Sequence, residues 1–353
     1  MSGGGMNGGS APRAGGDGEV RVGINGFGRI GRSVFRILAD RPGFRVAAVN
    51  DLFDNQQLAY LLKYDTVMDI YDREVTADDE AMFVGGERVE MTAERDPAAI
   101  PWGDLGVEVV IESTGVFRSR AQLEKHLAAG AERVVLTVPA KDAIDATVVI
   151  GVNDGELSAE HRIVSNASCT TNCLAPLAMI LDDAFGIEEG FLTTVHAYTN
   201  DQRLADVPHK DFRRSRAAAL NVIPTTTGAA RAVAKVLPRL EGKLDGMAMR
   251  VPVPDGSIVD FVCRLAATPS AADVNAALRE AAATERLAGI VEYSEVPLVS
   301  SDIIGNPHSS IVDALSTRAR GDGYAKVVSW YDNEWGYSNR VVDLLARVAE
   351  LGG

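Results

Sequence analysis

The stretch that decides the fold is Val20-Arg21-Val22-Gly23-Ile24-Asn25-Gly26-Phe27-Gly28-Arg29-Ile30-Gly31. Its first half is an apolar run typical of a buried strand, and its second half is a glycine-rich turn. The turn leads into a segment, 30–39, whose apolar residues recur at helical spacing. A second apolar run, 45–49, ends at Asn50-Asp51. Strand, glycine turn, helix and strand in this order predict the βαβ unit of a parallel sheet.

The glycines of this turn have the G-x-G-x-x-G spacing of a dinucleotide site. Gly26 would make the tight turn, Gly28 would let the backbone approach a pyrophosphate, and Gly31 would allow the helix to pack closely on the strand. Asp51 follows Gly31 by 20 residues, where a carboxylate binds ribose hydroxyls and repels a 2′-phosphate. The pattern therefore predicts NAD as the cofactor. The alternative is a structural turn followed by a helix-capping aspartate.

The remaining chain predicts an α/β protein with two domains, which agrees with a length of 353 residues. Residues 20–168 are assigned to a Rossmann-type nucleotide domain with a parallel sheet, and its further strands and helix are expected at 107–112, 120–129, 133–138 and 147–151. Residues 169–332 are assigned to an α+β catalytic domain with a mainly antiparallel sheet. Its helix is expected from about Thr170 to Phe185, and its strands at 191–198, 246–252, 258–265 and 325–331. A last helix is expected at 339–351.

The charge and the cysteine content of the chain indicate which macromolecules it binds and in which cell compartment it lies. The formal net charge is −14, from 35 Lys and Arg against 49 Asp and Glu, which disfavours binding to nucleic acid or to an anionic membrane surface. Three cysteines make no disulfide framework, and we find neither an apolar run of membrane-spanning length nor the pattern of a signal peptide. We expect a cytoplasmic protein. Residues 1–19 contain eight glycines and are interpreted as a flexible tail.

One cysteine lies where a reactive thiol would. Ser168 would cap the helix that follows it, and Cys169 would lie in the first turn, where backbone N–H groups and the helix dipole stabilise a thiolate. His196, at the end of an apolar strand, is the candidate base and ion-pair partner. The alternative is an inert buried cysteine and a structural histidine. Cys173 is expected to face the core, and because no further Cys or His clusters nearby, no metal is predicted.

A thiol and an imidazole beside a nicotinamide point to oxidation of an aldehyde. The sulfur would add to the carbonyl carbon to give a hemithioacetal, and loss of a hydride to NAD would leave a thioester. Arginines and hydroxyls suit phosphate, so two anion pockets beside the thiol are predicted, one for a phosphorylated substrate and one for an attacking phosphate. The candidates are Thr199, Arg214, Thr225, Thr226, Thr227, Gly228 and Arg250. For each arginine taken singly, a solvated charge is the alternative.

The chain from Val20 to its C-terminus resembles the phosphorylating glyceraldehyde-3-phosphate dehydrogenases of the NAD-dependent type. The matching segments are Asn25-Gly26-Phe27-Gly28-Arg29-Ile30-Gly31, Glu94-Arg95-Asp96-Pro97, Ser113-Thr114-Gly115, Ala167-Ser168-Cys169-Thr170-Thr171-Asn172-Cys173, His196-Ala197-Tyr198-Thr199-Asn200-Asp201-Gln202, Arg213-Arg214, Pro224-Thr225-Thr226-Thr227-Gly228-Ala229-Ala230 and Trp330-Tyr331-Asp332-Asn333-Glu334-Trp335-Gly336-Tyr337-Ser338. The resemblance implies reversible oxidative phosphorylation of D-glyceraldehyde 3-phosphate to 1,3-bisphosphoglycerate. It also implies a homotetramer with segment 199–223 at a subunit interface, and a C-terminal helix, within 333–353, that packs back on the nucleotide domain.

Matching positions carry the roles of the family onto this chain. The resemblance makes Cys169 the nucleophile and His196 its base. It places the phosphate of the aldehyde on Thr199 and Arg250. The attacking phosphate would lie on Ser168, Thr170, Arg214, Thr227 and Gly228. NAD would lie on Gly26, Gly28, Arg29, Ile30, Gly31, Asp51, Arg95, Thr114, Thr137, Asn333 and Tyr337, with Asn333 at the carboxamide. One departure is Val207-Pro208, where NAD-using members commonly have Leu-Pro.

Two other functions stay open at this point. The related dehydrogenase of erythrose 4-phosphate uses the same thiol, and the two substrates differ by about one hydroxymethylene, a difference worth only ~1–3 kcal/mol in a pocket. A non-catalytic binding protein with the same fold, such as an RNA-associated module, is the alternative from another class. The acidic charge and the presence of both Cys169 and His196 disfavour it.

Overall fold

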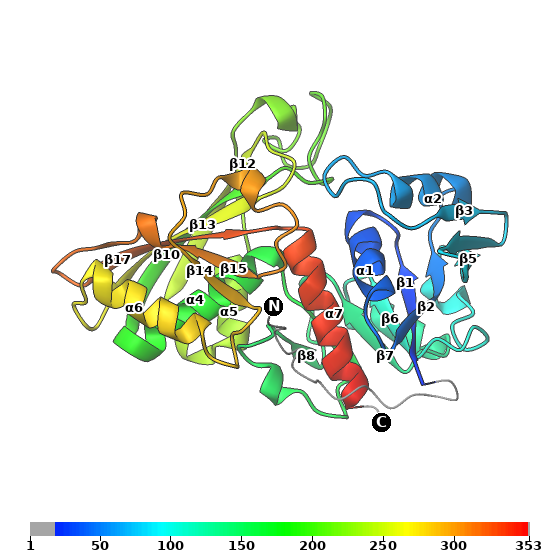
Figure 1. Ribbon diagram of the computed structural model, residues 1–353, viewed down its shortest axis with the longest axis horizontal. Helices are drawn as coiled ribbons and strands as arrows, with labels where there is room; N and C mark the ends of the chain where they lie inside the picture. Colours follow the sequence, from blue (N-terminus) through cyan, green and yellow to red (C-terminus); the bar gives the residue numbers. More distant parts are fainter. Residues whose placement is uncertain (1–17, 352–353) are drawn as a thin grey trace, which may run out of the picture.

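Two β-sheets organise the chain in the computed structural model, which describes residues 18–351 (Figure 1). Most of the predicted tail, residues 1–17, lies outside the described residues. Sheet A is formed by strands from residues 20–165, and sheet B by strands from residues 187–331. Among residues 18–351, no helix is both long and apolar enough to span a bilayer.

Sheet A has nine strands in the order β3-β4-β5-β2-β1-β6-β7-β9-β8. Their bounds are β1 Val20–Asn25, β2 Phe44–Asn50, β3 Val75–Ala77, β4 Ala81–Val84, β5 Glu87–Thr92, β6 Val109–Glu112, β7 Arg133–Leu136, β8 Ala146–Thr147 and β9 Ile163–Ser165. The strands from β5 to β8 pair in parallel, whereas β3, β4 and β5 pair antiparallel at one edge. The helices of this part are α1 Arg29–Ala39, α2 Asn55–Lys63 and α3 Arg120–Ala128.

Sheet B follows the order β11-β12-β10-β13-β17-β15-β14, with β16 paired to β17. The strand bounds are β10 Ile187–Ala197, β11 Ile223–Thr226, β12 Leu244–Val251, β13 Ser257–Leu265, β14 Val291–Ser294, β15 Ser310–Asp313, β16 Arg318–Ala319 and β17 Tyr324–Tyr331. Most pairs are antiparallel, as predicted, but β10 pairs with β12 and β14 with β15 in parallel. The predicted combination of a parallel-rich sheet and a mainly antiparallel sheet is confirmed.

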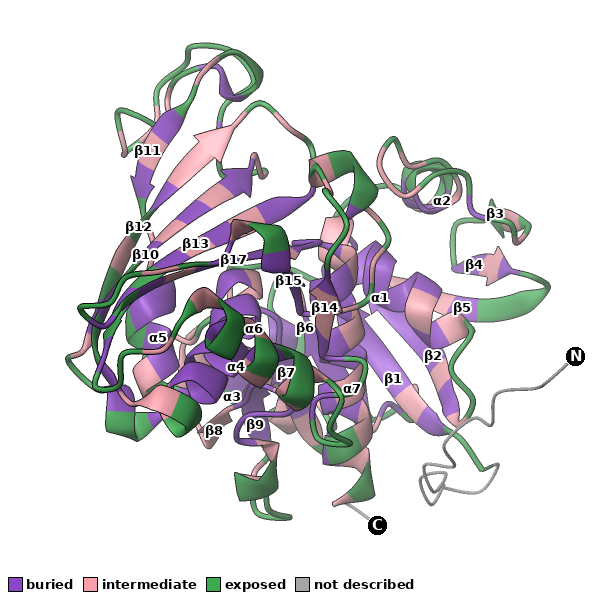
Figure 2. Ribbon diagram, turned by 60° about the vertical axis from the view of Figure 1, so that its left-hand side comes forward, coloured by how far each residue is buried: buried purple, intermediate pink, exposed green. Residues whose placement is uncertain are grey.

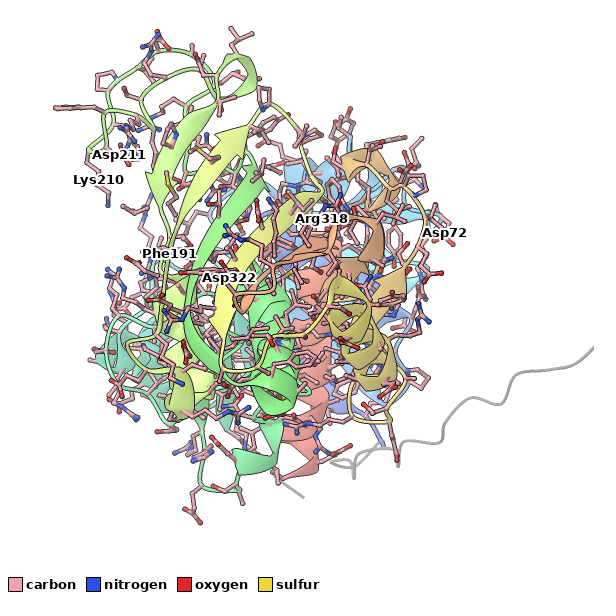
Figure 3. The ribbon with its side chains drawn as sticks, turned by 90° about the vertical axis from the view of Figure 1, so that its left-hand side faces the viewer. Asp72, Phe191, Lys210, Asp211, Arg318 and Asp322 are labelled. Atoms are coloured by element: carbon pink, nitrogen blue, oxygen red, sulfur yellow. The ribbon has the colours of Figure 1, made fainter. Side chains whose placement is uncertain are left out.

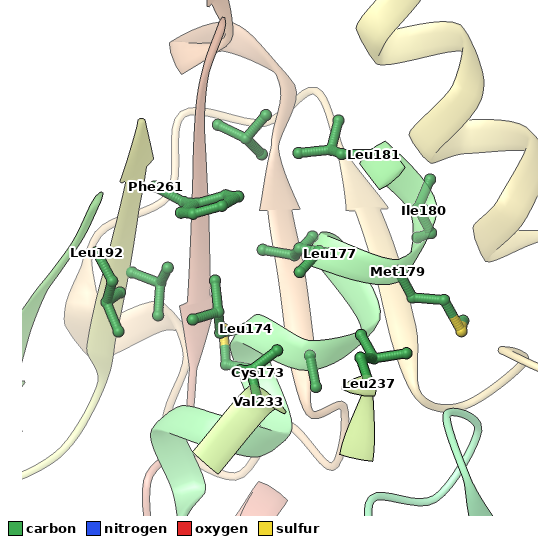
Figure 4. Packing of buried hydrophobic residues seen from close by; sticks show 14 of the residues in the cluster. Cys173, Leu174, Leu177, Met179, Ile180, Leu181, Leu192, Val233, Leu237 and Phe261 are labelled. Carbon is green, nitrogen blue, oxygen red and sulfur yellow. The ribbon is translucent and has the colours of Figure 1, made fainter. Parts of the chain in front are cut away.

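Helices cover one face of sheet B. The helices of this part are α4 Cys169–Phe185, α5 Ala229–Val236 and α6 Ala271–Ala282. Side chains of α4, including Leu174 and Leu177, form one hydrophobic core with Leu192 and Phe261 of the sheet (Figure 4). Cys173 belongs to this core, as predicted. Every second side chain of β13 is buried, and those between are half-buried or exposed (Figure 2). This alternation is typical of a sheet that is covered on one face.

The last helix, α7 Trp335–Glu350, packs against α1. Its apolar residues, including Val341 and Leu345, share a core with the strands of sheet A, so the chain returns to its first sheet after completing the second (Figure 1). The helix begins four residues before the expected position 339. Its start is set by Asp332, whose Oδ1 accepts hydrogen bonds from the backbone N–H groups of Glu334 (2.8 Å) and Trp335 (2.6 Å).

Other differences from the predicted elements have local causes. The expected strand 147–151 ends at Thr147, because the next residues turn and the N–H of Val149 donates to Asn153 Oδ1. Up to Ile223, where β11 begins, the long polar segment 199–223 contains only a short 3-10 turn, Ala218–Leu220, and an isolated bridge between Arg203 and Ala217. The helices and strands that the sequence analysis did not predict are α2, β3, β4, β5, α5, α6, β9, β11, β14, β15 and β16.

Candidate functional site

A cleft of about 730 Å³ lies between the two sheets, and residues of both parts line it. The predicted site residues that line it are Gly28, Arg29, Ile30, Thr114, Thr137, Ser168, Cys169, His196, Thr199, Asn333 and Tyr337. The cleft lies beyond the carboxyl ends of β1, β6 and β7, which is where parallel α/β sheets bind their ligands. Predicted residues outside this lining are Gly26, Gly31, Asp51, Arg95, Thr170, Arg214, Thr225, Thr226, Thr227, Gly228 and Arg250.

The three glycines of the first turn have different surroundings. Gly26 has φ +93°, and a Cβ there would lie 2.7 Å from the backbone nitrogen of Thr114. A Cβ at Gly31 would lie 2.2 Å from the carbonyl oxygen of Gly26. At Gly28, no atom lies within 4 Å of the Cβ position. The outer two glycines therefore serve the fold, and Gly28 faces open space where a pyrophosphate could approach the backbone.

Arg29 contributes to this turn through its backbone. Its guanidinium is held by two carboxylates, with Nη1 2.9 Å from Asp65 Oδ2 and Nε 2.5 Å from Glu334 Oε1. The N–H groups of Arg29 and Ile30 belong to the first turn of α1, where no intrahelical acceptor exists. These N–H groups, rather than the charged side chain, are available to an anion in the cleft.

Asp51 lies directly after β2, beside the same turn. Its Oδ2 accepts the backbone N–H of Phe27 (2.7 Å) and its Oδ1 that of Phe53 (3.2 Å). The carboxylate is half-buried, so part of it can still meet a ribose. Arg95 is exposed on the loop after β5 and forms no side-chain hydrogen bond with the described residues.

The next two strands carry a threonine each at the cleft. The hydroxyl of Thr114, just after β6, donates to Glu112 Oε1 (2.5 Å). The hydroxyl of Thr137, just after β7, donates to the carbonyl oxygen of Glu112 (3.0 Å). Glu112 is fully buried, so its hydrogen bonds hold both threonines in place. Together with Gly28 and Asp51, the two threonines lie at the carboxyl ends of neighbouring strands of sheet A.

Cys169 and His196 meet at this cleft. The distance from Cys169 Sγ to His196 Nε2 is 3.4 Å. Cys169 is the first residue of α4, and the cap is Ser168, as predicted, with its Oγ accepting the N–H of Thr171 (3.1 Å). Ala167, just before the cap, has φ +54°, a left-handed conformation that costs a non-glycine residue about 1–3 kcal/mol. The helix start is thus held in a strained but fixed geometry beside the imidazole.

Burial controls the protonation of this pair. Burial raises the pKa of the Cys169 thiol, and the positive charge of Arg250 and the N–H of Thr170 oppose that rise. Burial, and then the charge of Arg250, lowers the pKa of His196 to about 3. In this structure the neutral thiol and the neutral imidazole are therefore favoured over the predicted ion pair. Because Arg250 acts on both groups, an anion that binds Arg250 would make protonation of His196 easier.

The predicted anion residues separate into two groups. His196 Nδ1 lies 2.7 Å from the carbonyl oxygen of Ala197 and donates to it, which leaves Nε2 as the basic nitrogen. Arg250 Nη1 lies 2.9 Å from His196 Nδ1 and donates to the same carbonyl oxygen (3.0 Å) and to Thr199 Oγ1 (3.3 Å). Asp201 connects this pair to Arg214: it accepts the Thr199 hydroxyl (2.6 Å) and forms an ion pair with Arg214. Thr199, Arg214 and Arg250 are therefore brought together beside the base.

The remaining anion candidates lie elsewhere. Gly228 is the cap of α5, and Thr227 Oγ1 accepts the N–H of Ala229 (3.2 Å). No hydrogen bond of the described residues joins Thr227 or Gly228 to Cys169 or His196. The hydroxyl of Thr170 lies 2.9 Å from the hydroxyl of Tyr331 in the interior, so only its backbone N–H remains for an anion.

The C-terminal candidates come from α7, which carries Tyr337, and from the turn before it, which carries Asn333. Tyr337 Oη donates to the carbonyl oxygen of Ala167 (3.1 Å), next to the cap of α4. Asn333 lines the cleft and its Oδ1 accepts the Ser257 hydroxyl (2.6 Å). Among residues 18–351, no group of three or more His, Cys, Asp or Glu could hold a metal ion.

The sequence analysis assigned no role to several residues that line the cleft. Glu334 fixes Arg29, and its place directly after Asn333 was the available signal. Gln202 is buried and accepts the N–H of Thr199 through Oε1 (3.3 Å). Thr66 and Val67 come from the loop after α2, and no sequence pattern connects that loop to the cleft.

Comparison with known proteins places this geometry in a family. The family model described as "Glyceraldehyde 3-phosphate dehydrogenase, NAD binding domain" matches residues 20–120. The model described as "Glyceraldehyde 3-phosphate dehydrogenase, C-terminal domain" matches residues 168–333. Together they cover β1 to β6 of sheet A, all of sheet B and residues on both sides of the cleft.

Curated relatives match over nearly their whole length. "Glyceraldehyde-3-phosphate dehydrogenase 1" of Bacillus subtilis is 57% identical over 334 residues, 94% of this chain and 99% of the relative. "Glyceraldehyde-3-phosphate dehydrogenase" of Streptomyces coelicolor is 54% identical over 327 residues, 92% of this chain and 97% of the relative. The protein of the same name from Mycolicibacterium smegmatis is 52% identical over 339 residues, 94% and 99%. The chain therefore belongs to the glyceraldehyde-3-phosphate dehydrogenase family.

Proposed function

We propose that this chain catalyses the reversible oxidative phosphorylation of D-glyceraldehyde 3-phosphate to 1,3-bisphosphoglycerate, with Cys169 as nucleophile and His196 as base. The family is one of NAD-dependent oxidoreductases, and NAD is the cofactor. The observation that carries the residue roles is the 3.4 Å approach of Cys169 Sγ to His196 Nε2 in a cleft that Gly28 and Asn333 also line.

The residues present fit a dinucleotide. Gly28 leaves open space above the backbone, the first N–H groups of α1 have no intrahelical acceptor, and Asp51 lies beside the same turn. Thr114 and Thr137 line the same cleft as Cys169. Tyr337 of α7 and Asn333, in the turn before α7, line it as well. NAD, when bound, supplies the acceptor for the hydride.

The chemistry of the chain begins at the sulfur. His196 Nε2 takes the thiol proton, and Cys169 Sγ forms a bond to the aldehyde carbon; the same proton goes to the carbonyl oxygen and gives a hemithioacetal. His196 then accepts the hydroxyl proton while the hydride leaves the carbon, and a thioester remains. An oxygen of inorganic phosphate attacks the thioester, and the carbon–sulfur bond breaks. The start of α4 stabilises the departing thiolate.

Arg250 connects substrate binding to this proton transfer. We place the phosphate of the aldehyde on Arg250 and Thr199, and the attacking phosphate on Ser168, Thr170, Arg214, Thr227 and Gly228. A phosphate on Arg250 compensates the positive charge that lowers the pKa of His196. The base is therefore more readily protonated when substrate is present, which is when the thiol must ionise.

The proposal also covers the oligomeric state, the cell compartment and the domain bounds of the protein. We propose a cytoplasmic homotetramer in which segment 199–223 meets another subunit, supported by its exposed apolar side chains, with Leu204 86% and Phe212 87% exposed. Lys210 and Asp211 of this segment lie at the left-hand edge of the molecule in Figure 3. We also propose that residues 20–168 with 333–353 form the NAD-binding domain, and 169–332 the catalytic domain. Arg95 is proposed to contact the adenosine side of NAD.

Steady-state kinetics test the substrate. We expect NADH to form with D-glyceraldehyde 3-phosphate only when inorganic phosphate or arsenate is present, with a higher kcat/KM than for erythrose 4-phosphate. Faster oxidation of erythrose 4-phosphate without phosphate would assign the chain to the other aldehyde. Absence of turnover with both aldehydes would favour a non-catalytic protein.

A further inference from the structure

A buried serine outside the predicted set joins the segments that carry two residues of the cleft, His196 and Asn333. Ser257 is the first residue of β13 and is fully buried. Its Oγ accepts the backbone N–H of Ala197 (3.0 Å), and its hydroxyl donates to Asn333 Oδ1 (2.6 Å). Ala197 follows the base His196, so one hydroxyl links the strand end that carries the base to the side chain expected at the nicotinamide.

The chemistry of the hydroxyl fixes the orientation of the amide. Because the Ala197 N–H already donates to Oγ, the single Ser257 proton has to find an acceptor in a fully buried place. The amide atom 2.6 Å away provides that acceptor only if it is the oxygen, and the distance is typical of O–H···O bonds. The other amide atom, Asn333 Nδ2, forms no hydrogen bond with the described residues. The Ser257 hydroxyl thus keeps the amide donor of Asn333 free for a ligand.

The backbone of Asn333 is held from the same turn. Asp255 is 1% exposed, and its Oδ1 accepts the N–H of Asn333 (3.2 Å) and of Gly256 (2.8 Å). Gly256 has φ +81°, and a Cβ there would lie 2.2 Å from the carbonyl oxygen of Ser300. The turn 254–257 is therefore tightly constrained, and Pro254 within it lines the cleft.

We propose that Ser257 is a positioning residue for hydride transfer: it orients the Asn333 amide so that Nδ2 donates to the carboxamide oxygen of the nicotinamide. This inference rests on the proposed function. Because Ser257 Oγ also accepts the N–H of Ala197, the serine would align the nicotinamide ring with β10, the strand that carries His196. The residues that would hold the adenosine half of NAD, Asp51 and the glycine turn, make no hydrogen bond with Ser257 or Asn333.

The replacement Ser257→Ala tests the role. We expect kcat/KM for NAD to fall about 10- to 100-fold, the range for removing one partner of a buried hydrogen bond. The Kd of ADP-ribose, which lacks the nicotinamide, should stay within about twofold of the wild-type value, because no contact of its half is changed. Equal weakening of NAD and ADP-ribose, or no weakening of either, would overturn the proposal.

A matched control and a double variant separate positioning from stability. Ser310→Ala also removes a fully buried hydroxyl of sheet B, one that lies 2.8 Å from Ser329 Oγ, and it should leave both cofactor constants unchanged. The variant Ser257→Ala/Asn333→Ala should be no worse than Asn333→Ala alone, because the serine acts through the amide. Additive losses would contradict this. If Ser257→Ala does not fold, Ser257→Cys, which keeps the shape with a weaker donor, should show the same selective loss. A wild-type chain that binds ADP-ribose and NAD but shows no NAD-dependent turnover would overturn the proposed function itself.

Discussion

Replacing Gly28 by alanine should separate cofactor binding from folding. The backbone there has φ −70° and ψ −161°, an extended conformation that alanine adopts without strain. The added Cβ meets no atom of the chain within 4 Å. The folded protein therefore has no steric reason to lose stability, and the reduced freedom of the unfolded chain should stabilise it by ~0.4–1 kcal/mol.

The cofactor complex should respond in the opposite direction. The methyl group occupies the space through which a pyrophosphate approaches the backbone, and an added methyl in a filled site typically costs about 1–3 kcal/mol. At about 1.4 kcal/mol per tenfold change, the Kd of NAD should rise roughly 5- to 150-fold. Isothermal titration calorimetry gives the Kd, and thermal unfolding without cofactor gives the Tm.

Gly31→Ala is the control, because its Cβ would lie 2.2 Å from the carbonyl oxygen of Gly26. That variant should lower the Tm by roughly 2–4 °C for each kcal/mol of strain, whereas Gly28→Ala should not lower it at all. A Gly28→Ala protein that binds NAD with unchanged affinity would refute the assignment of this turn to the pyrophosphate.

Three further outcomes are expected. Cys169→Ser should reduce kcat by at least about a thousandfold with little change in the Kd of NAD; substantial remaining turnover would exclude Cys169 as the nucleophile. Asp51→Asn keeps an acceptor for the Phe27 N–H but removes the charge, so the ratio of kcat/KM for NADP to that for NAD should rise about tenfold; an unchanged ratio would argue against contact with the ribose. Burial and the neighbouring Asp332 raise the pKa of Asp255 from 3.8 to about 9, so the folded state retains a proton that the unfolded state loses near pH 3.8. The free energy of unfolding should therefore fall between these values as pH rises, and Asp255→Asn should flatten that fall in Tm measurements; an identical pH profile would count against the raised pKa.

Local signals allowed the nucleotide half of the site to be predicted. Strand β1 has the predicted bounds, and α1 begins one residue earlier than expected, because a βαβ unit is encoded by adjacent residues and its glycines have short-range causes. The Ser168 cap and the burial of Cys173 were predictable for the same reason: both depend only on the start and periodicity of one helix.

Contacts between distant segments could not be predicted. Arg29 and Glu334 are 305 positions apart, and Arg250 reaches His196 only because β12 pairs in parallel with β10, contrary to the antiparallel expectation for neighbours in this sheet. The charge of Arg250 lowers the pKa of His196, yet no sequence pattern near His196 predicts this contact. Likewise, Ser257 had no signal beyond strand alternation, because its role depends on Ala197 and Asn333 arriving from two other segments.

The hydrogen bond from Tyr337 to Ala167 has a consequence for the growing polypeptide. The helix that supplies this phenol follows both sheets in the chain, yet it holds the backbone just ahead of the reactive sulfur and completes the hydrophobic core of the first sheet. During synthesis, a ribosome that still holds residues 335–350 therefore carries a thiol whose surroundings are incomplete. The environment of this sulfur is finished only once those residues have left the ribosome and packed.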